Sequence, residues 1–257
     1  VIEKNLNDIS ISAKEIDETI MGCVLPAGLG QAPARQAAMG AGIPSESGAT
    51  TINKMCGSGM KSIMFGHDSI KAQQNNIVVA GGLENMTNAP YILSKARKGF
   101  RMGHADVKDH MFLDGLEDAY EEGKLMGSFA EDTAEHYQFT REQQDNFAIT
   151  SLKRAKKANE DGTFESEIVP IKILNRKNEI IINKDEQPFK SDITKIPTLK
   201  PAFRKNGTVT AANSSSISDG ASSVILMLES EAQKRGIKPL ARIIAVSYTH
   251  LRAHETS

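Results

Sequence analysis

The sequence has no tryptophan, only two cysteines among 257 residues, and almost no excess charge. Two cysteines cannot build a disulfide framework in a chain of this size, so we expect a reducing compartment, the cytoplasm. The net charge of −1 creates no global field that would attract nucleic acid or an anionic membrane. No apolar run approaches the roughly 18 residues of a membrane span. Neither nucleic acid nor a membrane is therefore expected as a partner.

Residues 49–82 have the pattern of a strand, a helix and a second strand. The segment ATTINK (49–54) is rich in β-branched residues, and 57–73 places apolar residues at helical spacing. NIVVAGG (76–82) is a continuous apolar run closed by glycines, which is typical of a buried strand. This order predicts two parallel strands joined by a right-handed helical crossover.

The flanking segments predict further elements of an α/β fold. Ser12 and Glu15 have the spacing of a capping box, and so do Thr140 and Gln143. We expect a short helix at 12–20, a strand at 21–28, helices at 31–44 and 140–161, paired strands at 167–173 and 179–185, and a strand, a helix and another strand between 221 and 246.

Cys56 falls at the turn between the first strand and the helix, within NKMCGSGMK (53–61). A helix N-terminus stabilises a thiolate through unpaired N–H groups and the helix dipole. Gly57 and Gly59 let a substrate approach the backbone, and the Cys56 N–H is a candidate oxyanion donor. Spacing alone leaves a nucleophile and a buried structural cysteine both open. A disulfide or metal role is disfavoured because no CxxC or clustered histidines accompany Cys56. Cys23 is expected in the core.

NKMCGSGMKSI (53–63), followed by VVAGGLENMTNAPY (78–91), closely resembles the thiolase family, acetyl-CoA acetyltransferases in particular. Three further segments are similar to that family and follow its order: 26–44, 124–134 and 207–222. The resemblance implies an α/β fold whose first domain holds a mixed sheet with helices on both faces.

The resemblance also implies a domain division. Residues 1–86 and 206–246 would form the thiolase N-terminal domain, and 87–205 an inserted α+β lid. The family's second domain carries a Gly-His-Pro histidine, a cysteine before a run of glycines and an Asn-Glu-Ala-Phe asparagine, and none of these motifs occurs here. We expect a chain truncated at both ends that lacks this domain. Residues 247–257 resemble translated sequencing-adapter read-through and are expected to be a non-native tail.

The family's activity then assigns roles to residues of this sequence. Cys56 matches the nucleophile that takes an acetyl group from acetyl-CoA, and a second acetyl-CoA condenses with it to give acetoacetyl-CoA, or the reverse. Coenzyme A is thus part of the substrate, and neither a resident cofactor nor a metal is implied. Full-length relatives imply a homotetramer or homodimer. The coenzyme A contacts implied are Leu116, Met126, Phe203, Ala211 and Ser215.

Some positions depart from the family pattern. Leu125 replaces a frequent histidine, and Phe189 and Lys190 stand near a frequent arginine that faces the adenine. Without a histidine base, we expect that this polypeptide alone does not condense acetyl-CoA. The alternatives are a 3-ketoacyl-CoA thiolase of broader chain length and a non-catalytic thiolase-like lipid-binding protein. In the family the cysteine-bearing helix lies between two sheets. We therefore expect part of the apolar surface around Met60 and Phe65 to be exposed.

Overall fold

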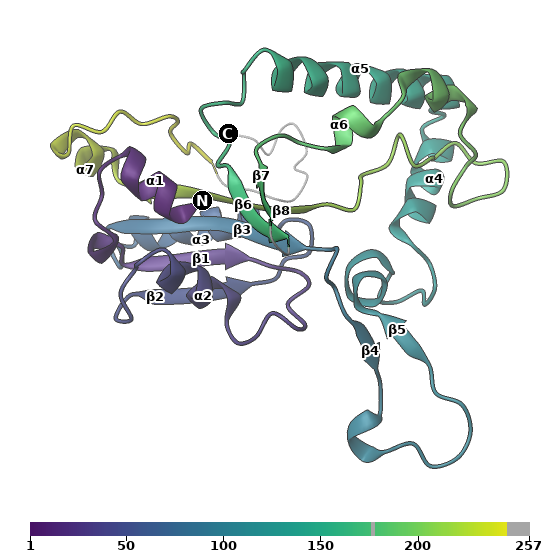
Figure 1. Ribbon diagram of the computed structural model, residues 1–257, viewed down its shortest axis with the longest axis horizontal. Helices are drawn as coiled ribbons and strands as arrows, with labels where there is room; N and C mark the ends of the chain where they lie inside the picture. Colours follow the sequence, from purple (N-terminus) through teal and green to yellow (C-terminus); the bar gives the residue numbers. More distant parts are fainter. Residues whose placement is uncertain (176–177, 246–257) are drawn as a thin grey trace. The chain divides into compact units, whose positions relative to one another are not determined.

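The computed structural model describes residues 1–175 and 178–245, which divide into two compact units (Figure 1). One unit comprises Val1–Gly115 and the chain from Ser218 onward, and the other is Leu116–Ile217. The predicted lid, 87–205, overlaps most of the second unit, and its assignment as a lid stays a prediction. The expected tail, 247–257, lies outside the described residues.

The first unit contains a four-stranded sheet with the strand order β2-β1-β3-β8. Its strands are β1 (Glu18–Gly22), β2 (Gly48–Ile52), β3 (Ile77–Asn85) and β8 (Asp219–Met227). β1 pairs in parallel with both β2 and β3, while β8 pairs antiparallel with β3, so the sheet is mixed, as expected. The two strands of the predicted strand–helix–strand unit, β2 and β3, are separated by β1.

Helices cover both faces of this sheet (Figure 1). The helices α1 (Ile2–Asp8) and α2 (Pro33–Gly40) share one core with Met21, Ile77 and Val79. On the other face, α3 (Ser58–Lys71) packs through Ile70 against Ile20 and Val78. Successive strand residues point to opposite faces, which is why neighbours such as Ile20 and Met21 belong to different cores.

Local signals explain where several elements begin. Pro33 occupies the first turn of α2, where its missing N–H costs nothing. Ser12 and Glu15 form the predicted capping box, but the helix that they start is a single turn of 3₁₀ helix, Ala13–Glu15. The expected helix at 12–20 is therefore too long, because β1 already begins at Glu18 to pair with β2 and β3.

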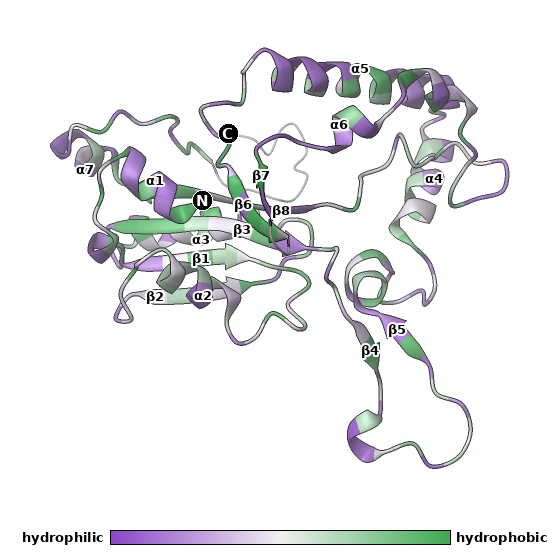
Figure 2. Ribbon diagram, viewed as in Figure 1, coloured by the Kyte–Doolittle hydropathy of each residue, from purple (hydrophilic) through white to green (hydrophobic). Residues whose placement is uncertain are grey.

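The second unit holds α4 (Met126–His136), α5 (Arg141–Glu160) and a β6–β7 hairpin (Ile171–Asn175 and Asn178–Ile182). It also holds α6 (Gln187–Lys190) and the 3₁₀ helix η4 (Ile193–Thr198). The capping box of Thr140 and Gln143 is present at the start of α5, as predicted. Figure 2 shows α5 as mostly hydrophilic, and Asp145 is its one buried residue among those described.

The remaining elements are short. The first unit also contains the β4–β5 hairpin (Tyr91–Leu93 and Val107–Asp109), the 3₁₀ turn η2 (Ala96–Lys98) and α7 (Glu229–Lys234). The π-helical turn η3 (Phe112–Leu116) runs up to the start of the second unit. The prediction of a strand after α7 is wrong for the described residues 235–245, which form no strand. None of the helices in the described chain combines the length and apolar character needed to cross a bilayer.

The outward surface of α3 carries exposed apolar side chains. Met60 is 54% exposed and Phe65 is 42% exposed, as expected, whereas Met64 is buried. The Lys61 ammonium lies 4.3 Å from the centre of the Phe65 ring, which gives this surface a cation–π contact.

Replacing Gly81 in β3 is predicted to disrupt the β3–β8 pairing. A Cβ at Gly81 would lie 2.1 Å from the Ser222 carbonyl oxygen, which is backbone and cannot move aside without breaking the ladder. Gly81→Ala should lower the free energy of unfolding by about 2–4 kcal/mol in urea denaturation. Gly220→Ala is the matched control, because nothing lies within 4 Å of its added Cβ. Equal losses in the two variants would contradict this account of the pairing.

Candidate active site

Cys56 lies in the turn that joins β2 to α3, two residues before the helix begins at Ser58. Its side chain is exposed, whereas Cys23 is 1% exposed. Of the two interpretations that spacing left open, the buried structural cysteine therefore fits Cys23 and not Cys56.

The turn is closed by hydrogen bonds from Ser58. The buried Ser58 hydroxyl accepts the Lys54 N–H at 2.8 Å and donates to the Met55 carbonyl at 2.6 Å. The Gly57 N–H donates to the Lys54 carbonyl at 3.1 Å. Ser58 thus fixes the chain on both sides of Met55, immediately before Cys56.

Glycines let α3 start directly against the sheet. A Cβ at Gly22 would lie 2.5 Å from the Ser58 carbonyl carbon and 2.6 Å from the Gly59 nitrogen. A Cβ at Gly82 would meet the Gly59 Cα at 3.4 Å. The buried Ser62 hydroxyl donates to the carbonyl oxygen of Gly81 in β3 at 2.7 Å. The first turn of α3 is therefore held at the carboxyl ends of β1 and β3, beside the end of β2.

An open pocket of about 390 Å³ lies around Cys56 at this edge of the sheet. Cys56 and Glu84 are the only ionisable residues in its lining, and no histidine lines it. Among residues 1–175 and 178–245, no three His, Cys, Asp or Glu side chains gather in a way that could hold a metal ion. The lining residues are Gly22, Val24, Met55, Cys56, Ser58, Gly59, Gly82, Leu83, Glu84, Gly220, Ala221 and Ser222.

Glu84 ties the end of β1 to the end of β3. Its carboxylate accepts the Val24 N–H at 3.0 Å and the Leu25 N–H at 2.9 Å. The Cys23 thiol lies 3.6 Å from the same carboxylate. Burial, and then the negative charge of Glu84, raise the pKa of the Cys23 thiol to about 11. Cys23 is therefore a neutral thiol at physiological pH and is not a competing nucleophile.

All five predicted coenzyme A contacts belong to the second unit. Met126 begins α4, and the ring of Phe203 lies against Gly127, where an added Cβ would be 2.3 Å from the ring. Leu116 is half-buried, while Ala211 and Ser215 are exposed in the loop between η4 and β8. Phe203 thus lies against the residue that follows Met126 in α4.

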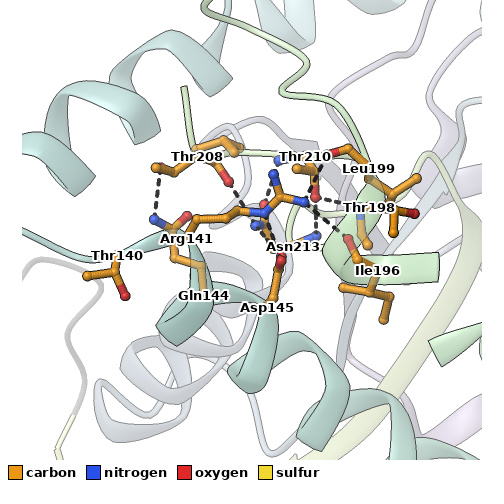
Figure 3. Close-up of polar contacts among 12 residues, drawn as sticks. Thr140, Arg141, Gln144, Asp145, Ile196, Thr198, Leu199, Thr208, Thr210 and Asn213 are labelled. Atoms are coloured by element: carbon orange, nitrogen blue, oxygen red, sulfur yellow. Dashed lines mark hydrogen bonds and ion pairs between the residues drawn. The ribbon is translucent and has the colours of Figure 1, made fainter. Parts of the chain in front are cut away.

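An ion pair between the partly exposed Arg141 and the buried Asp145 anchors the loop that carries Ala211 and Ser215 (Figure 3). Arg141 Nε donates to Asp145 at 2.7 Å, and its Nη2 donates to the carbonyls of Ile196 at 3.1 Å and Leu199 at 2.9 Å. The amide of Asn213 donates to the other oxygen of Asp145 at 3.2 Å. Asn213 lies between Ala211 and Ser215, so the ion pair fixes the middle of the loop to α5 and η4.

A second buried carboxylate holds the start of this loop. Glu131 on α4 is 3% exposed and accepts the Thr208 N–H at 2.9 Å and the Val209 N–H at 2.8 Å. A Cβ at Gly207 would lie 2.1 Å from a carboxylate oxygen of Glu131, so only glycine fits at this position. Glu131 and Asp145 are functional residues that the sequence does not reveal, because its pattern does not distinguish a buried carboxylate from a solvated one on a polar helix.

Comparison with known proteins places these features in a family. Residues 1–230 match the family model described as "Thiolase, N-terminal domain". A probable acetyl-CoA acetyltransferase of Dictyostelium discoideum is 50% identical over 244 residues, which are 95% of this chain and 59% of that protein. A probable acetyl-CoA acyltransferase of Staphylococcus aureus is 46% identical over 243 residues, 94% of this chain and 62% of that protein. The chain therefore spans about 60% of the length of these relatives.

Solved structures show the same similarity. A thiolase from Ascaris suum, solved in complex with coenzyme A, matches with a TM-score of 0.86 and 38% identity over 93% of this chain and 61% of that chain. The acetyl-CoA acetyltransferase of Bacillus anthracis matches with a TM-score of 0.88 and 39% identity over the same shares.

The two cysteines are predicted to react very differently with iodoacetamide. At about pH 8, Cys56 should be alkylated while Cys23 stays unmodified, because Cys23 is buried and burial raises the pKa of its thiol to about 11. Peptide mass spectrometry after a timed reaction measures both sites. Cys23→Ser should react like the parent, and Cys56→Ser should react only after denaturation. Modification of native Cys23 would contradict the assignment.

Removing Asp145 is predicted to destabilise the second unit. Asp145→Ala leaves Arg141 without its carboxylate in a largely buried position and removes one acceptor of Asn213. We expect the free energy of unfolding to fall by about 2–3 kcal/mol, below the range for a fully buried pair because Arg141 is partly exposed. Urea denaturation followed by circular dichroism measures the loss. Asn146→Ala, an exposed neighbour on α5, should change stability by less than about 0.5 kcal/mol. A loss no larger than that of the control would show that the ion pair contributes nothing.

Proposed function

This chain belongs to the thiolase family, and we propose that it is the acyl-accepting part of an acetyl-CoA acetyltransferase. The observation that carries the proposal is the exposed Cys56 thiol in the pocket at the start of α3. The curated relatives named as probable acetyl-CoA acetyltransferase and acyltransferase support the same class.

The first half-reaction needs a thiolate and a place for the developing oxyanion. Cys56 loses its proton to solvent, and its sulfur attacks the thioester carbonyl of acetyl-CoA. The new S–C bond gives acetyl-Cys56, the old S–C bond breaks, and coenzyme A leaves as a thiolate that takes up a proton. The Cys56 N–H is a donor for the oxyanion.

The second half-reaction is a Claisen condensation. A second acetyl-CoA loses an α-proton, its carbanion attacks acetyl-Cys56, and acetoacetyl-CoA leaves as the thiolate returns to Cys56. Thiolysis is the reverse. This step needs a base, and the pocket lining offers only Glu84, whose oxygens are already engaged by the Val24 and Leu25 N–H groups. We therefore expect acetyl transfer to Cys56 without measurable condensation by this polypeptide alone.

We propose the second unit as the source of coenzyme A contacts. The apolar side chains of Met126 and Phe203 suit the pantetheine arm, since Phe203 packs against Gly127, the residue next to Met126, with Leu116 as a further apolar contact. The exposed hydroxyl of Ser215 suits an amide of that arm, with Ala211 beside it on the same loop. The Ascaris suum thiolase that was solved with coenzyme A supports a coenzyme A thioester as the substrate class.

A 3-ketoacyl-CoA thiolase of broader chain length is the second candidate, because the Staphylococcus aureus relative carries the broader name acetyl-CoA acyltransferase. Comparing the rates at which Cys56 is acylated by acetyl-CoA and by octanoyl-CoA separates the two activities. A strong preference for acetyl supports the acetyltransferase. A non-catalytic lipid-binding protein would leave Cys56 unacylated by both.

The acetyl acceptor is predicted to be Cys56 alone. Incubation with acetyl-CoA should add one acetyl group to the parent chain and to Cys23→Ser, and none to Cys56→Ala, as measured by intact mass. An assay for acetoacetyl-CoA in the same reaction should find no product above background. Acetylation that persists in Cys56→Ala would contradict the assignment of Cys56 as the nucleophile. Turnover to acetoacetyl-CoA would contradict the expectation that this polypeptide lacks a base for the condensation.

A further inference from the structure

The residue before Cys56 has a backbone conformation that its side chain does not favour. Met55 has φ +50°, in the left-handed region that glycine adopts readily and methionine rarely. Such a conformation persists only where the surrounding contacts impose it. What holds Met55 in place therefore also decides how Cys56 is presented.

Both polar groups of Met55 are bound. Its N–H donates to Oδ1 of Asn53 at 2.9 Å. Its carbonyl accepts from the Ser58 hydroxyl at 2.6 Å and from the Ser58 N–H at 3.0 Å. Asn53 thus binds the N–H of Met55, and Ser58 binds its carbonyl.

These hydrogen bonds orient the peptide group between Met55 and Cys56. In a planar trans peptide, the carbonyl of Met55 and the N–H of Cys56 point in opposite directions. Because Ser58 fixes the carbonyl, the Cys56 N–H points away from Ser58. The direction of the Cys56 N–H is thereby fixed, and Met55 and Cys56 both line the pocket.

We propose that Asn53 is a positioning residue for acyl transfer: it holds Met55 so that the Cys56 N–H meets the oxyanion formed when the Cys56 thiolate attacks a thioester. This rests on the proposed function of Cys56. The Asn53 amide is in turn anchored by a long contact, 3.4 Å, from its Nδ2 to the Val24 carbonyl. The Val24 N–H donates to Glu84, so β3 supports the turn through two side chains.

Two reactions of the same thiol separate this role from a general effect on Cys56. Acetylation passes through an oxyanion and uses the N–H donor. Alkylation by iodoacetamide displaces iodide and forms no oxyanion at the reacting carbon. Both rates are proportional to the fraction of Cys56 present as thiolate, so this fraction cancels in their ratio and a fall in the ratio reports the oxyanion donor.

The experiment measures both rates on the full chain by intact mass, with acetyl-CoA and iodoacetamide as the reagents. Asn53→Ala should lower the acetylation rate about tenfold and the alkylation rate less than about threefold, so the ratio falls. Asn53→Gln moves the amide oxygen by one methylene and should lower the ratio as well. Asn53→Asp keeps an oxygen for the Met55 N–H and should keep the ratio within about threefold of the parent value.

Asn75→Ala is the matched control. Asn75 donates to Glu18 at 2.8 Å and to Ser69 at 3.2 Å, near the other end of α3, so its loss should leave the ratio unchanged. An unchanged ratio in Asn53→Ala, or an equal fall in Asn53→Asp, would overturn the proposal. If acetyl-CoA does not acetylate the parent, the proposed function fails. The ratio measured with p-nitrophenyl acetate, which also forms an oxyanion, then still decides the role of Asn53.

Discussion

The close approach of α3 to the carboxyl ends of β1 and β3 is the constraint on which the rest of the first unit depends. Gly22 and Gly82 leave no side chain between the strands and the first turn of the helix. That contact places the turn before α3 at the sheet edge, where the pocket forms. Any larger residue at Gly22 would push the backbone of Ser58 away and move Cys56 with it. The site is thus a product of backbone packing before any side chain contributes chemistry.

The second unit achieves order by a different route. Its long helix α5 is largely polar and has little apolar surface to bury (Figure 2). Instead, the buried carboxylates Glu131 and Asp145 collect N–H groups from a loop that has no regular structure. Such networks are directional, so they specify one loop conformation where apolar packing alone would allow several. The precision of the loop that bears Ser215 therefore depends on charges placed far from it in the sequence.

Much of the fold was predictable because the signals are local. The apolar run in β3, the helical spacing in α3 and the capping box of α5 each report on a few neighbouring residues. Predictions failed where pairing between distant segments decides. β1 begins at Glu18 because two neighbours pair with it there, and residues 235–245 form no strand although their composition suits one.

The candidate site was predictable only in part, for a related reason. Its central cysteine was marked by the glycines and the helix that follow it. The residue that supports this cysteine, Asn53, was not predictable. An asparagine that accepts the backbone N–H two residues later is a common local pattern, and it becomes informative only once Met55 is seen in a left-handed conformation. The sequence likewise places Glu84 only near the end of a strand. The structure shows that its carboxylate accepts the N–H groups of Val24 and Leu25.

The position of β8 has a consequence for how the protein is made. β8 pairs along the whole of β3, from Ile77 opposite Met227 to Asn85 opposite Asp219, yet the entire second unit lies between them in the chain. At typical rates of translation, β3 leaves the ribosome on the order of ten seconds before its partner. During that time the nascent chain presents an apolar strand with one open edge. The helices that cover its faces can fold first, so the unpaired edge is the point at which a chaperone, or another nascent chain, would engage it.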